Sequence, residues 1–506
     1  MRPLPLLVLL GALALGLRCI GLTAPWGADN LGTAGAFFSI AARNYPAYGY
    51  LATRLVPVVT AEGPPSPAVY YANHPPLVPL LVSASFAVFG EHEWAARLVP
   101  LLAALASLAM LGYLAARFYG SRVALLTLAI AATLPLDAHL AAHVDVQGSV
   151  LLAAVLATLI ALAHRRHAAA IACLTLGALA DWPALYVPVL LAVAPWPFEH
   201  ARPRRFVGAL LVYGGVLLVA LASWLAGPET VFALLRDRAL SFRADDGRPF
   251  HLAGWFQLVV GSYLWQLCTP LVLVVVLAWL VLRVPVLVSR PHPERLALFL
   301  LLFGLMHMIV GFQGAYQHEF WAHYLRAGVP LVCALAIDRA SSWVAPGPRR
   351  TALVAGLLAA LMVPGLVGTL RLAEHPVSAR MLDEAYTPRE LARVLRDCTP
   401  AGAGAFTSDY YGEGATFYYT DRPLAVAVFS LGALEERLRA RRYDVPGGAG
   451  LSYTTPSAVP ACFVVPRQHE HQFADLVQRL RHEFAARVEG PFEVFALVAP
   501  APSQGH

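Results

Sequence analysis

Long apolar stretches, separated by short polar or basic connections, occupy most of the first 370 residues. Eleven of them approach the roughly 17–25 apolar residues that cross a bilayer as a helix. A further run at 77–90 is shorter, and apolar runs of about 10–14 residues are typical of re-entrant or interfacial helices. The pattern predicts a mainly α fold, a polytopic transmembrane bundle of about eleven spans near residues 4–22, 94–116, 122–140, 147–163, 168–182, 183–198, 206–226, 256–283, 295–313, 323–340 and 351–370.

Arginine-bearing connections give this bundle an orientation. They are "ARFYGSR", "HRRH", "EHARPRR", "SRPHPER" and "PGPRR", and cytoplasmic loops collect basic residues. All five fall on one side only if residues 77–90 do not span. We therefore expect a cytoplasmic N-terminus, interfacial helices in a first outer loop at 23–93, and an extracytoplasmic C-terminal part.

The pattern changes after about residue 371. Charged, helix-like runs at 388–397, 433–443 and 468–487 alternate with the strand-like pieces "GAFTS", "LAVAVF", "CFVVP" and "FEVFALVA". This alternation predicts a small α/β domain over 371–506, following a membrane domain over 1–370. Cys398 and Cys462 both lie in this part, and an oxidising compartment would permit a disulfide between them.

Composition supports a membrane location. The chain is 58% hydrophobic and only 13% charged, whereas soluble domains carry about 25% charge. The net charge of +6 comes from arginines without any lysine. Because these arginines gather in short loops, they are better explained as topology signals than as a nucleic-acid surface. No glycine-rich nucleotide loop of the Walker type is present.

Asp29 directly follows the first predicted span, in "PWGADN". One interpretation is that it caps the short helix after it, a position that aspartate favours. The other is a carboxylate in a cleft at the membrane surface, where partial desolvation would raise its pKa towards the working range of a general base. The residues alone leave both interpretations open.

A second acidic residue, Asp145, lies with His139 and His143 at the outer end of the third span. It is suited to cap the next helix, or to join Asp29 as a second carboxylate at the same surface. A divalent metal ion is conceivable beside His143, but the spacing matches no strong metal-ligand motif, so we predict no metal ligands.

Polar residues with aromatic neighbours mark two further outer segments. They belong either to an ordinary interfacial aromatic belt with snorkelling arginines, or to a site for an anionic lipid headgroup. His74 sits in a turn made rigid by two prolines and is suited to donate to such a headgroup. The candidate binding residues are Arg43, Tyr71, His74, Arg97, His318, Glu319, His323 and Tyr324.

The order of these motifs resembles that of the polytopic GT-C glycosyltransferases of the protein O-mannosyltransferase and lipid A aminoarabinose transferase type. The resemblance covers roughly residues 1 to 340, and "HPPLVPLL", "FGEHEWAARLVP", "VDVQGSVLL", "ADWPALYVP" and "QHEFWAHYL" carry it. It implies that Asp29 is the catalytic base and that Asp145 matches the second outer acidic position. This chain has His74 where the aminoarabinose-type enzymes usually carry a phosphate-binding lysine, and Asn30 where the family often has glutamate.

The resemblance therefore implies an enzyme of the bacterial inner membrane. It would move a hexosyl or pentosyl group from a polyprenyl-phosphate donor in the bilayer to an envelope acceptor, by inversion, on the extracytoplasmic side. The alternative is a membrane transporter or flippase for lipid-linked or small solutes, which predicts ionisable residues in mid-span. Nearly all ionisable residues lie at helix ends here. His307 is the exception, and neither function explains its position.

Overall fold

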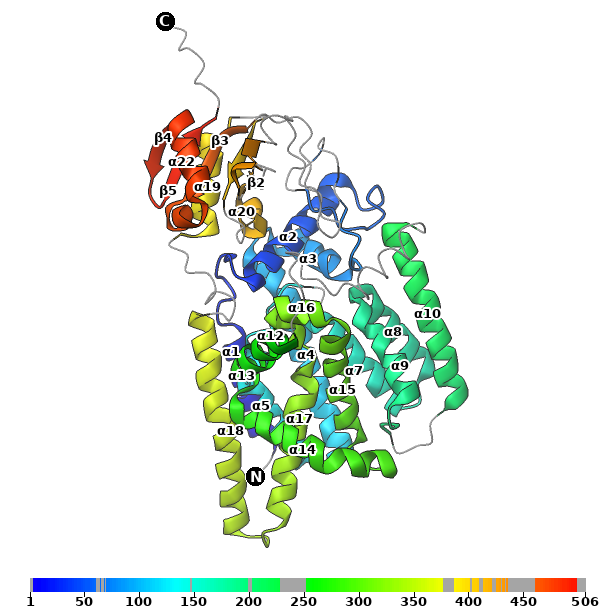
Figure 1. Ribbon diagram of the computed structural model, residues 1–506. Coiled ribbons are helices and arrows are strands. Elements are labelled where there is room, and N and C mark those ends of the chain that lie inside the picture. The colour runs from blue at the N-terminus through cyan, green and yellow to red at the C-terminus, as the bar shows by residue number, and fades with distance from the viewer. Residues whose placement is uncertain are drawn as a thin grey trace, which may run out of the picture. The chain divides into compact units, whose positions relative to one another are not determined.

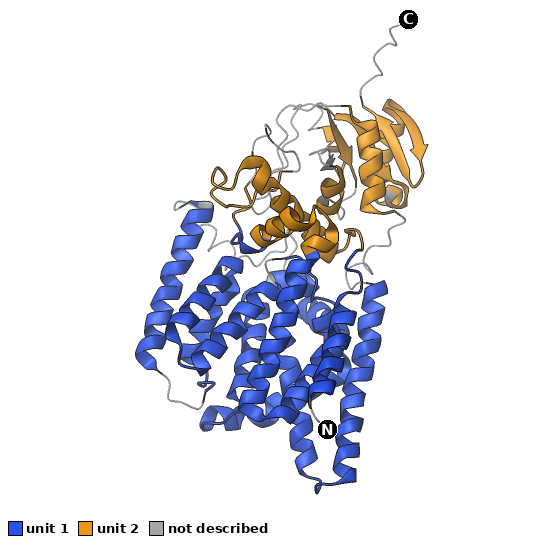
Figure 2. Cartoon of the chain, turned by 180° about the vertical axis from the view of Figure 1, so that it is seen from behind, with its two compact units in different colours: residues 1–23, 73–78, 97–377 blue, residues 24–72, 79–96, 378–506 orange. Residues whose placement is uncertain are grey.

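The computed structural model describes residues 3–60, 64, 68, 70–145, 148–198, 203–227, 252–375, 386–400, 403–408, 413–420, 425–428, 430–432, 434–435 and 460–497. These residues divide into two compact units, shown in blue and orange in Figure 2. Unit 1 contains residues 1–23, 73–78 and 97–377, and unit 2 contains residues 24–72, 79–96 and 378–506. The predicted division near residue 370 into two domains stays a prediction.

Unit 1 is a bundle of helices (Figure 1). Its elements are α1 (Pro3–Arg18), α4 (Glu93–Tyr119, of which 97–119 belong to this unit), α5 (Ser121–Thr133), α6 (Pro135–Ala138), α7 (Ser149–Ala163), α8 (His167–Ala180), the 3-10 turn η1 (Trp182–Leu185), α9 (Tyr186–Val193), α10 (Arg204–Ala226), α12 (Leu252–Trp255), the π-helix η2 (Phe256–Leu264), α13 (Trp265–Cys268), α14 (Pro270–Ser289), α15 (Arg295–Val310), α16 (Phe312–Gln317), the 3-10 turn η3 (Glu319–Ala322), α17 (Leu325–Ser342) and α18 (Pro348–Glu374).

Helices occur at each of the eleven predicted spans. Within the described residues, four helices are long and apolar enough to cross a membrane, and seven apolar helices are shorter. The four long ones are α4, α10, α14 and α18. The mainly helical fold is confirmed, whereas the number of about eleven spans stays a prediction. The predicted span 256–283 is interrupted at Thr269, which has a φ of 64°.

Small residues bring α15 and α17 close together. A Cβ added at Gly304 would lie 2.7 Å from the backbone nitrogen of Leu325, and one at Gly328 would lie 2.7 Å from the backbone nitrogen of Leu301. Close approach at glycine is how helices in a membrane gain packing contacts. This contact sets the end of α15 beside η3 and the start of α17, where several polar side chains lie.

Unit 2 combines two helices of the first loop with a small C-terminal sheet. The helices α2 (Asn30–Tyr48) and α3 (Leu77–Phe89) confirm helix formation in the first loop, and their interfacial location stays a prediction. The remaining elements are α19 (Pro388–Cys398), β1 (Gly404–Thr407), α20 (Glu413–Thr420), β2 (Ala425–Ala427), β3 (Pro460–Pro466), the 3-10 turn η5 (Arg467–Phe473), α22 (Ala474–Glu483), β4 (Ala485–Glu489) and β5 (Phe492–Ala496).

The sheet has five strands in the order β2-β1-β3-β5-β4. β1 pairs in parallel with β2 and β3, and β5 pairs antiparallel with β3 and β4. Four of these strands coincide with the predicted strand-like pieces. The fifth, β4, occupies the end of the run 468–487 that the charge pattern assigned to a helix. Residue 433 and residues 436–443 of the predicted helix 433–443 lie outside the described residues.

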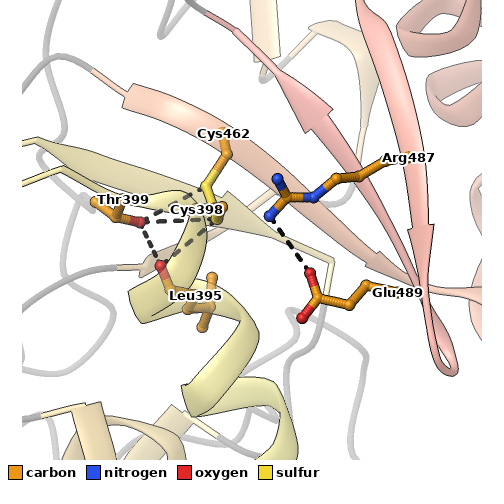
Figure 3. Close-up of a disulfide and its surroundings, with 6 residues drawn as sticks. All are labelled: Leu395, Cys398, Thr399, Cys462, Arg487 and Glu489. Carbon is orange, nitrogen blue, oxygen red and sulfur yellow. Dashed lines mark hydrogen bonds and ion pairs between the residues drawn. A yellow bond between two sulfur atoms is a disulfide. The ribbon is translucent and has the colours of Figure 1, made fainter.

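Because side chains alternate along a strand, the sheet presents two faces. On one face Phe463 and Val465 of β3 join a hydrophobic core with Leu476 and Leu480 of α22. On the other face Cys462 of β3 forms a disulfide with Cys398 at the end of α19 (Figure 3). The bridge spans 64 residues of sequence and ties the first helix of the domain to its central strand.

Candidate functional site

The HPP turn of unit 1 is bound to the residues that follow α8. The Nδ1 atom of His74 lies 2.7 Å from Oδ1 of Asp181. The indole Nε1 of Trp182 donates a hydrogen bond of 2.7 Å to the carbonyl oxygen of Asn73. The backbone N–H of Trp182 also donates to Asp181 Oδ1, over 2.8 Å. "NHPP" and "ADWP" therefore form one locally fixed unit, although more than 100 residues separate them.

Asp145 and His143 form a second buried group. His143 Nε2 lies 3.5 Å from Asp145 Oδ2, and the His143 ring lies 4.7 Å from that of Phe320. Both residues are less than a tenth exposed. Gly148 occupies the N-cap position of α7, so the cap interpretation of Asp145 does not fit the structure.

His307 lies near the end of α15, buried among aromatic rings. It stacks on Trp321 at 4.4 Å with nearly parallel planes, and it meets Tyr324 edge-on at 4.8 Å. Neither of its ring nitrogens has a hydrogen-bond partner within the part of the chain that the structure describes, and the same holds for the hydroxyl of Tyr324. Buried polar atoms usually have a hydrogen-bond partner, so these three atoms are notable.

Electrostatic interactions join these groups into what we call the His74 cluster: His74, Asp145, Asp181, His307 and Tyr324. His307 interacts with His74 and Asp145. The Tyr324 hydroxyl interacts with Asp181 and Asp145. The sequence motifs carrying these side chains were predicted as separate candidates, and the fold of unit 1 brings them together. Asp181 was not predicted as a site residue, and His307 could not be placed.

The other predicted residues of the last outer loop lie beside this cluster. His318 stacks on Phe320 at 4.9 Å, Glu319 is buried at the start of η3, and His323 Nε2 lies 2.7 Å from Arg326 Nη1. Arg97 donates a 3.0 Å bond to the carbonyl oxygen of Leu22. These side chains therefore contact other groups of the protein.

Deeper polar contacts form what we call the Asp137 cluster: Arg18, Asp137, Ser149, His323 and Arg326. Asp137 Oδ1 lies 3.0 Å from Arg18 and 2.6 Å from Arg326, and all three side chains are at most 5% exposed. Arg326 also donates a 2.8 Å bond to Ser149. Of these residues, the sequence analysis named only His323; the signal for the other charged residues was one charged side chain in each of three otherwise apolar stretches.

In unit 2, Asp29 is the N-cap residue of α2. Its carboxylate accepts a hydrogen bond from the backbone N–H of Gly32. The cap interpretation is therefore confirmed, and it leaves the catalytic interpretation open because capping occupies one face of one carboxylate oxygen.

The segment before Asp29 is bound to α20 within the same unit. The Tyr419 hydroxyl accepts a 2.7 Å bond from the N–H of Trp26 and donates a 2.7 Å bond to Glu93. Burial, together with the hydrogen bond to Glu93, raises the pKa of Tyr419 to about 12. Tyr419 is thus a neutral phenol at physiological pH that anchors the Asp29 segment.

The remaining two predicted binding residues also contact partners within unit 2. Arg43 of α2 lies 3.4 Å from Glu91 and donates to the carbonyl oxygen of Tyr418. Tyr71 packs edge-on against Phe37, with ring centroids 4.9 Å apart. Within the described residues no three His, Cys, Asp or Glu side chains gather in an arrangement suited to a metal ion.

Part of the chain matches a known family model. Residues 73–227 match the family model of dolichyl-phosphate-mannose-protein mannosyltransferases. This segment contains His74, Asp145 and Asp181. A comparison with curated proteins gives no match.

Two solved structures show the fold. The chain is similar to ArnT from Cupriavidus metallidurans bound to undecaprenyl phosphate, with a TM-score of 0.57, 14% identity and 99% of each chain covered. It is also similar to the Archaeoglobus fulgidus oligosaccharyltransferase, with a TM-score of 0.58, 10% identity, and coverage of 93% of this chain and 70% of that one. The predicted resemblance to the polytopic GT-C glycosyltransferases is confirmed. The family match and the apolar helices indicate a multi-pass membrane protein.

Proposed function

We propose that this protein is an integral-membrane glycosyltransferase that moves a sugar from a polyprenyl-phosphate donor to an envelope acceptor. The observation that carries the proposal is the His74 cluster, in which ionisable and hydroxyl side chains converge at one end of an apolar bundle. Buried polar groups are costly in such surroundings unless they are satisfied or used. The undecaprenyl phosphate bound to ArnT and the family description both support a lipid-phosphate donor.

In the proposed reaction Asp29 is the general base. It takes the proton from the acceptor hydroxyl or amine while that atom attacks the anomeric carbon and the bond to the lipid phosphate breaks. The anomeric carbon develops oxocarbenium character, and one displacement inverts its configuration. His74, His318 and Arg43 stabilise the departing phosphate, because fixed donors aimed at a developing anion commonly supply the largest catalytic term. Asp145 is the second acidic residue of the site.

The proposed location is the bacterial inner membrane, with the N-terminus in the cytoplasm and the C-terminal domain outside. The Cys398–Cys462 disulfide supports the outer location of this domain, because disulfides persist mainly in oxidising compartments. Binding of the Asp29 segment to α20 supports a role for the C-terminal domain in holding the base.

The test is transfer of label from radiolabelled polyprenyl-phosphate sugars in membrane vesicles that contain wild type or Asp29→Asn. Asparagine caps helices as well as aspartate does, so this variant keeps the Gly32 hydrogen bond while removing the base. We expect the wild type to release label from the lipid into an acceptor and the variant to lose at least 100-fold in rate. Asp397→Asn, an exposed change in α19, is the matched control.

Equal rates in wild type and Asp29→Asn would remove Asp29 from the mechanism. Movement of the intact labelled lipid across the membrane, without cleavage of its sugar, would instead favour the transporter or flippase alternative.

A further inference from the structure

Asp181 lies at a junction between two elements and contacts His74 from a fixed position. It directly follows α8 and is the N-cap residue of η1, so its backbone is held on both sides. Its side chain is 1% exposed, and its Oδ1 atom faces both His74 Nδ1 and the N–H of Trp182. A buried carboxylate is tolerated where it meets donors, and these two are suited to that role.

The cap alone does not explain an aspartate at this position. The bond from the N–H of Trp182 requires an oxygen acceptor, which asparagine or serine would also supply. The contact with His74 is different, because a carboxylate pairs with an imidazole most strongly when the imidazole carries a proton on both nitrogens. The side chain of His74 keeps 15% exposure, so it is accessible where Asp181 is not.

The two nitrogens of an imidazole point away from each other. With Nδ1 directed at Asp181, Nε2 is directed to the side opposite the carboxylate. The second anchor, from Trp182 to the carbonyl oxygen of Asn73, fixes the backbone beside the ring. Pro75 and Pro76 then restrict the chain that follows. Ring and backbone are thus held together, which gives Nε2 a defined direction.

We propose that Asp181 is a positioning residue that holds the His74 imidazole by Nδ1 so that Nε2 donates a hydrogen bond to the phosphate of the lipid-linked donor. This inference rests on the proposed function. It accounts for the histidine, which unlike lysine needs a second group to fix its tautomer and direction before it can serve as a donor. Asp181 itself does not touch the donor.

The first test measures binding of radiolabelled undecaprenyl phosphate to the full chain in detergent. Asp181→Asn keeps an acceptor for Trp182 and removes the carboxylate. We expect its dissociation constant to rise about tenfold, because the neutral amide oxygen still meets His74 Nδ1 but no longer forms a charge-assisted hydrogen bond with it. Asp338→Asn, which makes the same chemical change at an exposed pair with Arg122 in the same unit, should bind as the wild type does.

The second test separates positioning from a structural role. A residue that acts through His74 has no effect once His74 is gone. In the His74→Ala background, Asp181→Asn should therefore change binding and the donor kcat/KM by less than about twofold, whereas in the wild-type background it changes both about tenfold. In the His74→Lys background the effect should also shrink, since lysine donates without a fixed tautomer.

An equal effect of Asp181→Asn with and without His74 would show a structural role and overturn the proposal. Wild-type binding and kcat/KM in Asp181→Asn would overturn it too, while leaving the proposed function intact. If the wild type transfers no sugar from any donor, the proposed function fails. Binding of undecaprenyl phosphate to the single and double variants would still decide whether Asp181 acts through His74. Should Asp181→Asn fail to fold, Asp181→Glu replaces it, with the expectation of partly retained binding.

Discussion

Asp137 and Asp181 are both buried aspartates of unit 1, and their surroundings differ in a way that separates stability from function. Asp137 contacts two arginines, and every side chain of that ion pair network is almost fully buried. Asp181 contacts a single histidine that remains partly exposed. The first carboxylate is enclosed by its own compensating charges. The second carboxylate orients the partly exposed His74 ring, and this arrangement is expected where a ligand binds.

The largest effect is expected from Asp137→Asn. It leaves Arg18 and Arg326 buried without their shared counter-ion, and removal of one partner of a buried ion pair typically costs about 3–5 kcal/mol. We expect a much lower thermal unfolding midpoint in detergent and poor recovery of folded protein. Asp397→Asn, whose side chain is 53% exposed in an i,i+4 pair, is the control and should unfold as the wild type does. An unfolding midpoint equal to that of the wild type would show that Asp137 does not stabilise the fold, and the distinction between the two aspartates would fail.

Unit 2 fixes its sheet by a covalent bond, and breaking that bond should have the next largest effect. Cys398→Ser removes the bridge to Cys462, whose loop of 64 residues restricts the unfolded chain. Loss of such a disulfide typically costs about 2–4 kcal/mol. Limited proteolysis should then cleave the C-terminal domain faster while the helices of unit 1 stay protected. Cys173→Ser, at a free cysteine of α8, should change nothing, and equal protection of both variants would contradict the prediction.

Arg326→Lys tests whether charge or geometry holds the Asp137 cluster. Lysine keeps the charge but cannot donate to Asp137, Ser149 and His323 in three fixed directions, as Arg326 does. We expect a loss of about 1.5–3 kcal/mol, the range for hydrogen bonds to charged groups. Arg339→Lys, half exposed and 4.0 Å from Glu294, is the matched change at the surface. Equal unfolding midpoints for the two variants would mean that charge alone is sufficient.

The sequence predicted the helical bundle and most of the C-terminal strands, because apolar length and alternation are local properties of the chain. It did not predict β4, since this short strand is mostly exposed and continues a charged, helix-like run of sequence. The Asp137 cluster was missed for a different reason. Arg18, Asp137 and Arg326 are far apart in sequence, and no local pattern says that they pair.

The candidate site was predictable in part for the same reason. Motifs pointed to His74, Asp145 and Tyr324 individually, because polar residues at span ends are conspicuous in an apolar chain. The pairing of His74 with Asp181 depends on how α8 ends, and the surroundings of His307 depend on how closely α15 packs on α17. Those facts belong to tertiary structure.

Asp181→Asn should affect the stability of unit 1 far less than Asp137→Asn does. The variant retains an acceptor for the N–H of Trp182, and the bond from Trp182 to Asn73 is untouched. We expect less than about 1 kcal/mol of destabilisation, within the range of ordinary cap substitutions. The measurement is the thermal midpoint of the ligand-free protein in detergent. A loss as large as that of Asp137→Asn would place Asp181 among the structural ion pairs and end the comparison.

The smallest effect is expected at the surface of the C-terminal domain, where an exposed carboxylate can be compared with the two buried aspartates. Glu470 bonds to Arg481, and this hydrogen bond lowers the pKa of Glu470 below its ordinary value. A carboxyl whose pKa is lower in the folded state stabilises the fold at pH values above its unfolded pKa of about 4.3, and that stabilisation is lost as the pH falls through the folded value. Because Arg481 keeps its two-pronged bond to the buried Glu493, Glu470→Gln should cost at most about 1 kcal/mol at pH 7. Protease resistance of the domain, compared between wild type and variant from pH 7 to pH 3, should show a small difference that closes below about pH 4. A difference that widens on acidification would mean that the fold stabilises the protonated form of Glu470. The bond to Arg481 would then not determine the direction of the pKa shift.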